Sequence, residues 1–277
     1  METTQIDIKK VIENKNKKLA RRLPSFVYAL IEKFVHLKEI NEILQKYGDL
    51  SGAAFAEGAL NYLDVSGRVK YTHEPAKNRR YLFVSNHPLG GLDGLIFINE
   101  ISRRFGPSKF IVNDFLFNIK PLQDIFIPVN KTGKTSRINL ENIRHAYSAE
   151  YNICNFPAGL CSRLLQGKIA DPPWHKNFVR EAAESGRDIV PLFFSGRNSM
   201  AFYRLAKLRK FLGIKFNIEM LFLPHELFKQ KGASFDMIIG EPITAQEIIE
   251  SGKSAQEWCD YIREKVYEYG SSYSTGR

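Results

Sequence analysis

Apolar and polar positions along the chain repeat with two periods, one typical of buried β-strands and one typical of amphipathic α-helices. Short apolar runs predict strands at residues 81–85, 109–112, 125–129, 151–156, 188–194, 216–222 and 235–239. Between most of these runs the apolar residues have helical spacing, which predicts helices at residues 92–104, 137–150, 175–185 and 199–212. This alternation predicts an α/β fold with a mostly parallel sheet that helices flank on both faces.

The chain before this alternation has a different pattern, with amphipathic helices and many basic residues. We therefore expect three parts: a basic, amphipathic N-terminal helical extension at residues 1–60, a main domain at 61–270, and a flexible tail of small polar residues at 271–277. Residues 244–247 and 254–257 each begin with Ser or Thr and end with Glu. Both segments predict capping boxes at helix starts.

Positive charge is concentrated in two segments of the chain, whose formal net charge is +10. Residues 9–22 carry seven basic side chains and one acidic side chain, and residues 197–215 carry six basic side chains and no acidic one. Each segment adjoins an amphipathic helix, a combination typical of helices that lie on an anionic membrane surface. The alternative is that these helices pack on the protein's own core and their charges are solvated.

Other partners and locations fit the sequence less well. No nucleic-acid-binding motif accompanies the charge, so nucleic acid is not expected as a partner. No apolar run approaches the ~20 residues of a membrane-spanning helix, and the first residues lack the pattern of a secretory signal. We therefore expect a peripheral protein on the cytoplasmic face of a membrane.

Cysteine and histidine residues do not show the spacing of a metal site. The cysteines, Cys154, Cys161 and Cys259, form no paired disulfide framework, which is consistent with a reducing compartment. The sequence also lacks a complete phosphate-binding loop, a serine-hydrolase nucleophile motif and a dinucleotide-binding glycine motif. We expect neither a metal nor another cofactor.

The most informative polar residues lie in the turn between a predicted strand and the predicted helix at 92–104. In this turn His87 precedes Asp93, with Gly90 and Gly91 between them. In open α/β sheets, ligands bind at such strand-to-helix turns. A carboxylate bonded to one imidazole nitrogen leaves the other nitrogen free to accept a proton, so His87 is a candidate general base. The alternative is a turn histidine beside an Asp that caps the helix.

Four blocks in the chain resemble, in order, those of the glycerolipid and lysophospholipid acyltransferase superfamily. They are Asn86-His87 with the following Asp, Phe156-Pro157-x-Gly159, Ile189-Val190-Pro191 and Ile239-Gly240-Glu241-Pro242-Ile243. The resemblance implies transfer of a fatty acyl group from an acyl carrier protein or coenzyme A thioester to a hydroxyl of a lipid acceptor. It identifies residues 61–270 as an acyltransferase domain.

The resemblance also implies the roles of site residues. His87 is then the base, Asp93 orients it, and no acyl-enzyme forms. The remaining matched positions would bind substrate: Asn86, Gly90, Gly91, Phe156, Pro157 and Gly159.

The chain departs from the superfamily pattern at three places. Five residues separate His87 from Asp93 where the superfamily has four, and the intervening glycines can absorb the extra residue. In the block at 156–162 Ala158 and Cys161 replace the Glu and Arg associated with holding a glycerol phosphate. In another superfamily block, which here is Phe126-Ile127-Pro128-Val129-Asn130-Lys131, Lys131 replaces an Arg, and lysine lacks the bidentate fork. A phosphate on the acceptor is therefore less strongly implied.

A further set of variants resembles the bacterial hemolysin-like branch, which includes O-acyltransferases that act on N-acylated amino acids to make ornithine or glycine lipids. The set is His-Pro-Leu-Gly-Gly-Leu-Asp-Gly at 87–94, Phe-Pro-Ala-Gly at 156–159 with Ser162-Arg163, Pro173-Trp174 before Phe178, and Ser195-Gly196-Arg197-Asn198-Ser199. An acceptor that carries a carboxylate fits a site with Ser162 and the cations Lys131, Arg163 and Arg197.

Two alternatives remain open at this point. One keeps the chemistry and changes the acceptor to lysophosphatidic acid. The other is a non-catalytic basic module that binds a membrane or nucleic acid. For individual residues, simpler roles also remain: the three cations can be solvated strand-end charges, Trp174 is expected to pack, and Cys161 is expected to be a small filler and not a nucleophile.

Overall fold

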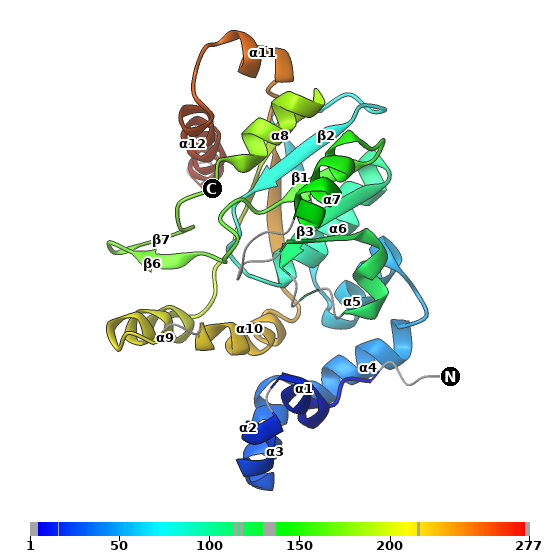
Figure 1. Cartoon of the computed structure of the whole chain (residues 1–277), viewed down its shortest axis with the longest axis vertical. Coiled ribbons are helices and arrows are strands. Elements are labelled where there is room, and N and C mark those ends of the chain that lie inside the picture. The colour runs from blue at the N-terminus through cyan, green and yellow to red at the C-terminus, as the bar shows by residue number, and fades with distance from the viewer. Residues whose placement is uncertain are drawn as a thin grey trace.

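The computed structural model describes residues 5–15, 17–113, 116, 119–129, 137–214 and 217–274. Among these residues, seven strands form one sheet in the order β1-β9-β8-β2-β5-β3-β4, and helices cover both of its faces (Figure 1). Strands β8, β2, β5, β3 and β4 are parallel, whereas β9 and β1 run in the opposite direction. The predicted α/β fold with a mostly parallel sheet is confirmed.

The strands of the sheet are β1 (Ser66–Tyr71), β2 (Tyr81–Ser85), β3 (Ser108–Asn113), β4 (Phe126–Val129), β5 (Asn152–Asn155), β8 (Asp188–Phe194) and β9 (Ser234–Ile239). A separate antiparallel hairpin consists of β6 (Arg163–Leu165) and β7 (Lys168–Ala170). The helices are α1 (Ile8–Lys15), α2 (Lys17–Arg22), α3 (Ser25–Phe34), α4 (Leu37–Tyr47), α5 (Gly52–Leu63), α6 (Leu92–Phe105), α7 (Arg137–Ser148), α8 (Asn177–Ser185), α9 (Met200–Phe211), α10 (Leu223–Lys229), α11 (Ala245–Glu250) and α12 (Ala255–Ser274). Two 3₁₀ segments are η2 (Lys120–Ile125) and η3 (Ile218–Phe222).

The two faces of the sheet bury separate apolar clusters, because successive side chains of a strand point to opposite faces. In β2, Phe83 packs on one face in a cluster that includes Leu60 of α5 and Ile96 of α6. The side chain of the preceding residue, Leu82, points to the opposite face and lies in the other cluster with Phe178 of α8. Burying each such side chain contributes about 1.5–3 kcal/mol. The strand ends that carry the site are thus held from both sides.

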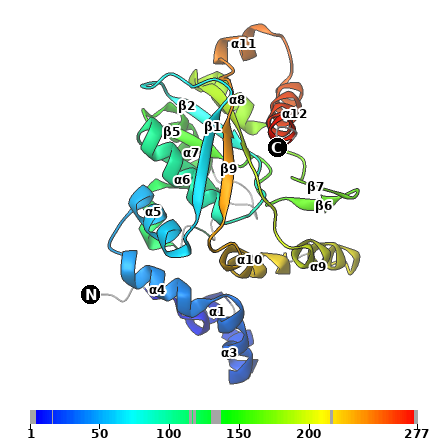
Figure 2. The same ribbon diagram turned by 180° about the vertical axis from the view of Figure 1, so that it is seen from behind.

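The N-terminal helices α1–α4 extend away from the sheet, at the end of the molecule where α9 and α10 lie (Figure 1 and Figure 2). They are joined to the main domain by Phe34, whose ring lies 4.3 Å from that of Phe222, and by a 2.9 Å hydrogen bond between His36 Nε2 and His225 Nδ1. None of the described helices combines the length and the apolar character needed to cross a membrane.

The predicted part boundaries fall inside helices of the structure. Helix α5 crosses the expected boundary at residue 60 and packs in the main core, and Ile43 and Leu44 of α4 are buried in the same core. Helix α12 continues through Ser274, past the expected start of the tail at residue 271. Residues 275–277 lie outside the described residues, and the division into three parts stays a prediction.

The predicted strand at 216–222 is wrong. Ile218–Phe222 forms η3, which continues directly into α10. Its residues are used in side-chain contacts: Phe222 packs against Phe34, and Glu219 pairs with Arg209 at 2.8 Å. Strand β1 was not predicted because its sequence, Ser-Gly-Arg-Val-Lys-Tyr, contains no continuous apolar run. Both predicted capping boxes are confirmed by their reciprocal hydrogen bonds.

Candidate active site

Most of the predicted site residues follow the carboxyl ends of β5, β2 and β8, which are adjacent in the sheet. Asn86 and His87 follow β2, Phe156 follows β5, and Arg197 follows β8. The carboxyl ends of adjacent parallel strands form one edge, and this edge is where open α/β sheets bind ligands. The structure therefore brings together residues that are far apart in the sequence.

Asn86 fixes the direction of the chain where it leaves β2. Its Nδ2 donates to the backbone oxygen of Phe194 at 2.9 Å, and its Oδ1 accepts the backbone N–H of Phe194 at 2.7 Å. The buried side chain thus continues the hydrogen bonding between β2 and β8 past the last paired residue. These contacts are those of a residue that positions His87.

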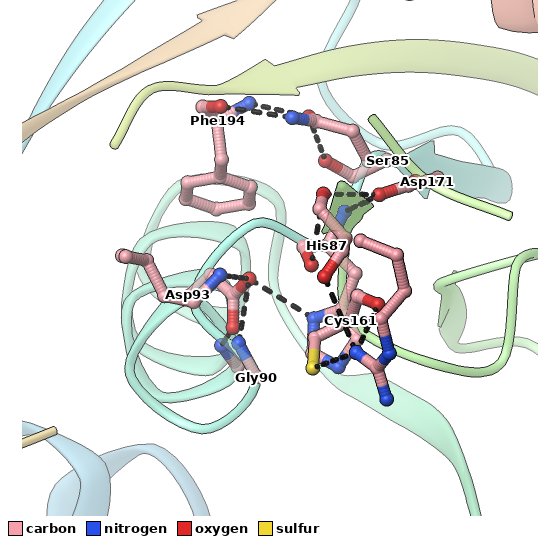
Figure 3. Close-up of polar contacts among 12 residues, drawn as sticks. Ser85, His87, Gly90, Asp93, Cys161, Asp171 and Phe194 are labelled. Atoms are coloured by element: carbon pink, nitrogen blue, oxygen red, sulfur yellow. Dashed lines mark hydrogen bonds and ion pairs between the residues drawn. The ribbon is translucent and has the colours of Figure 1, made fainter. Parts of the chain in front are cut away.

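Asp93 holds the ring of His87 in one orientation. Asp93 lies in the first turn of α6, and its Oδ2 lies 3.0 Å from His87 Nδ1 (Figure 3). Because an ionised carboxylate only accepts hydrogen bonds, this geometry predicts that Nδ1 carries the proton and that the lone pair of the neutral ring is on Nε2. The Asp93 side chain is fully buried, whereas 15% of the His87 side chain is exposed. The imidazole is therefore the accessible part of this pair.

Three backbone N–H groups hold the Asp93 carboxylate from its other sides. Leu89 and Gly90 donate to Oδ2 at 2.9 and 3.3 Å, and Gly94 donates to Oδ1 at 2.9 Å. Gly90 has a φ of 85°, which favours glycine, and a Cβ there would lie 2.7 Å from the Leu223 side chain. The glycine turn thus allows His87 and Asp93 to meet despite the additional residue between them.

Phe156 covers one face of the His87 ring. The two ring centroids are 4.0 Å apart and the planes differ by 20°. Phe156 begins a turn in which Gly159, with a φ of 61°, donates its N–H to the Phe156 oxygen at 2.8 Å. The buried Pro157 lies in this turn and accepts the backbone N–H of His175 at 3.0 Å. The stacking restricts rotation of the imidazole.

A second carboxylate, which the sequence analysis did not identify, holds the main chain of His87. Both oxygens of Asp171 accept the His87 backbone N–H at 3.2 Å. Asp171 also accepts the Ser162 hydroxyl at 2.6 Å and the Trp174 indole N–H at 3.0 Å. Burial raises the pKa of Asp171 above its ordinary value, and the hydrogen bonds from Ser162 and Trp174 oppose that rise.

Ser162 completes the support of His87. Its backbone N–H donates to the His87 oxygen at 2.8 Å, so both backbone groups of His87 are bonded to the segment that follows β5. Trp174 is buried in the core and also bonds Asp171, which agrees with its expected packing role. On the far side of Asp171, Tyr267 of α12 accepts its backbone N–H at 2.8 Å. The sequence analysis did not identify Asp171 because its partners His87 and Tyr267 lie 84 and 96 residues away in the chain.

The three predicted cations differ in their surroundings. Lys131 lies outside the described residues. The guanidinium of Arg163 pairs through Nη2 with the fully buried Glu219 at 3.0 Å, and its Nη1 donates to the Cys161 oxygen at 2.7 Å. Arg197 is exposed on the loop after β8 and forms no ion pair with any described residue. Arg163 is thus engaged within the fold, whereas Arg197 is available to a ligand.

Cys161 has the character of a buried thiol. Burial raises its pKa to about 11, although the neighbouring Arg163, whose Nη1 lies 2.9 Å from Sγ, acts to lower it. A thiol with this pKa is a poor nucleophile at neutral pH. Within the described part of the chain, no group of three or more His, Cys, Asp or Glu side chains is arranged to hold a metal ion.

Comparison with solved structures identifies the class of fold. The structure is similar to the crystal structure of the 1-acyl-sn-glycerophosphate (LPA) acyltransferase PlsC from Thermotoga maritima, with a TM-score of 0.50 and 16% sequence identity. The match covers 91% of this chain and 93% of the other. The two chains therefore share a fold.

Sequence comparison identifies the family. The pattern of the family described as Acyltransferase matches residues 10–276, and the chain belongs to this family. A lyso-glycine lipid O-acyltransferase from Bacteroides thetaiotaomicron is 39% identical over 264 residues, which cover 95% of this chain and 97% of the relative. A lyso-glycine lipid O-acyltransferase from Phocaeicola vulgatus is 38% identical over 264 residues, which cover 95% of this chain and 94% of that relative.

These comparisons confirm the resemblance inferred from the motif blocks. The chain is an O-acyltransferase of lipid metabolism, and its partners include an acyl donor and a lipid acceptor.

The contacts of Asp171 predict that its removal affects both stability and activity. Asp171→Ala leaves the Trp174 indole and the His87 backbone N–H without an acceptor, which we expect to cost about 1–3 kcal/mol of unfolding free energy. A shift of His87 should lower acyl transfer by roughly tenfold or more. Asp171→Asn, which keeps one acceptor oxygen, should have smaller effects on both. The measurements are urea unfolding and thioester turnover.

The exposed Asp260→Ala variant is the matched control for this test. Wild-type turnover in a folded Asp171→Ala protein would show that His87 does not depend on Asp171.

Proposed function

We propose that this acyltransferase transfers a fatty acyl group from a thioester to the hydroxyl of an N-acylated glycine, the lyso form of a glycine lipid. The choice of acceptor is based on the similarity to two lyso-glycine lipid O-acyltransferases, at 39% and 38% identity over 95% of the chain. The block at 156–162 supports the same choice, since Ala158 and Cys161 replace the residues associated with a glycerol phosphate.

In the proposed reaction His87 is the general base and Asp93 orients it. His87 Nε2 removes the proton from the acceptor hydroxyl as the hydroxyl oxygen attacks the thioester carbonyl carbon. The resulting tetrahedral intermediate breaks its C–S bond, and the imidazolium returns the proton to the departing thiolate. Asp93, 3.0 Å from Nδ1, stabilises the imidazolium between these two transfers. No acyl-enzyme is required.

The acceptor's carboxylate is assigned to Arg197. Arg163 is only 11% exposed, and its guanidinium is already bonded to Glu219 and to the Cys161 oxygen, so it is less accessible to a ligand than Arg197. Arg197 is exposed, and the residue before it, Gly196, lies against Leu89 of the catalytic turn. A guanidinium there can bind a carboxylate in bidentate geometry at the rim of the site.

The test of this function is parallel measurement of acyl transfer to lyso-glycine lipid, lyso-ornithine lipid and lysophosphatidic acid, with acyl carrier protein and coenzyme A thioesters as donors. We expect the highest kcat/KM for lyso-glycine lipid. His87→Ala should lower transfer by about 10²- to 10⁴-fold, because it removes the base.

The exposed His175→Ala variant should transfer at the wild-type rate. Preference for lysophosphatidic acid would refute the proposed acceptor, and full activity of folded His87→Ala would refute the proposed base.

We infer that the protein acts as a peripheral protein on an anionic, cytoplasm-facing membrane surface. Exposed apolar side chains and exposed basic side chains are close together in the chain in two regions. Phe26 and Leu30 of α3 follow Arg21 and Arg22 of α2, and Leu208 and Phe211 of α9 and the next residue, Leu212, alternate with Arg204, Lys207 and Lys210. Helices α3 and α9 lie at the same end of the molecule (Figure 1 and Figure 2). Each cation near an anionic leaflet contributes about 1 kcal/mol, and buried apolar side chains add to this.

This inference predicts vesicle binding that requires anionic lipid and weakens with salt. Phe211 is 86% exposed, so Phe211→Ser should weaken binding by roughly tenfold. Ile249 is the matched control: it is 63% exposed but lies on α11, at the opposite end of the molecule (Figure 1). Co-sedimentation with vesicles measures both variants. Equal losses for Ile249→Ser and Phe211→Ser, or binding independent of charge, would contradict the proposed membrane face.

A further inference from the structure

Asn198 has a buried side-chain amide that the fold does not use. The residue is 3% exposed, and neither Oδ1 nor Nδ2 has a hydrogen-bond partner among the described residues. Buried polar groups in folded proteins are nearly always paired, so an orphaned amide with both a donor and an acceptor requires an explanation. A ligand that supplies the missing partners is one such explanation.

The orphaned amide is not the result of a loosely held loop. The backbone N–H of Asn198 donates to the buried Tyr203 hydroxyl at 3.0 Å. The next residue, Ser199, caps α9 and is bonded twice to the buried Glu226, through its backbone N–H at 2.5 Å and its hydroxyl at 2.7 Å. The main chain on this side of Asn198 is therefore fixed, and its side chain remains without a partner.

Asn198 follows a glycine that adjoins the turn holding His87 and Asp93. Gly196, two residues earlier, is so close to Leu89 that a Cβ there would lie 3.3 Å from the Leu89 side chain. The backbone N–H of Leu89 is one of the three that hold Asp93. Two residues of chain span at most about 7 Å, so Asn198 lies within that distance of Gly196. Tyr203, which accepts the Asn198 backbone N–H, packs with Cys161, the residue before Ser162.

The chemistry of a carboxamide selects its ligand. An Asn side chain offers one N–H donor and one oxygen acceptor side by side, which matches a secondary amide that offers a carbonyl and an N–H. A phosphate or a carboxylate only accepts, and an ester has no N–H, so each would leave Oδ1 unpaired. An N-acylated amino acid contains a secondary amide between its carboxylate and its acyl chain, whereas lysophosphatidic acid contains an ester.

We propose that Asn198 is a specificity-determining residue that pairs with the amide of the acceptor, with Nδ2 donating to the amide carbonyl and Oδ1 accepting the amide N–H. The inference rests on the proposed function, since it concerns the same acceptor. It divides acceptor recognition between adjacent residues: exposed Arg197 binds the carboxylate and buried Asn198 binds the amide.

The experiment compares two acceptors, lyso-glycine lipid and its ester analogue, in which oxygen replaces the amide nitrogen. The wild-type enzyme should prefer the amide in kcat/KM by at least about tenfold, because the ester leaves a buried acceptor unpaired. Asn198→Leu, of similar size, removes both amide groups and should reduce this preference to within about twofold. Asn198→Ala serves as a second variant if the leucine protein does not fold.

Asn152 provides the matched control. It is also 3% exposed, but its Oδ1 accepts the Tyr81 backbone N–H at 2.9 Å and its Nδ2 donates to the Phe105 oxygen at 2.8 Å. Asn152→Leu should lower the melting temperature and keep the wild-type preference between acceptors. If Asn198 had only a structural role, the Asn198 variants would likewise have a lower melting temperature and keep the wild-type preference between acceptors.

The outcomes separate this inference from the proposed function. A wild-type enzyme that acylates neither compound refutes the proposed function itself. A wild-type enzyme that acylates both equally, or an Asn198 variant that keeps the wild-type preference, refutes only the role of Asn198. Loss of the preference in the Asn198 variants and its retention in Asn152→Leu supports the pairing.

Discussion

The buried carboxylate of Asp93 is the group on which the geometry of the site depends. It accepts three backbone N–H groups and faces His87 Nδ1 at 3.0 Å. A carboxylate buried without such partners is strongly disfavoured, so the turn must adopt the conformation that directs these N–H groups inward. The positive φ at Gly90 is part of that conformation. Formation of the turn and orientation of the imidazole are therefore coupled.

The remainder of the site supports the same histidine from distant segments. Asn86 ties the end of β2 to β8, Asp171 and Ser162 bond the backbone of His87, and the ring stacks on Phe156. Helix α10 lies between the turn that holds His87 and the N-terminal extension, since Leu223 adjoins Gly90 while His225 bonds His36. The helices proposed to contact the membrane are thus connected through one short helix to the turn of the proposed base.

The sequence alone predicts the features that depend on residues close together in the chain or on a repeating pattern of apolar positions. His87 and Asp93 lie in one turn, so their spacing reveals their pairing, whereas Asp171 is 84 residues from His87 and is brought to it only by the fold. Arg163 can be recognised in the sequence as a cation, but Glu219, with which it forms an ion pair, lies 56 residues away. The apolar run at 216–222 has the composition of a strand, and tertiary contacts of the side chains select a 3₁₀ segment and a helix instead.

The most direct test of the account is the tautomer of His87, measured from the ¹⁵N chemical shifts of its imidazole in the full-length protein at a pH where the ring is neutral. Comparison with the spectrum of His87→Ala assigns the resonances. The account predicts a protonated, pyrrole-type Nδ1 bonded to Asp93 and an unprotonated, pyridine-type Nε2 that is free to act as the base. An unprotonated Nδ1 with a protonated Nε2 would contradict it.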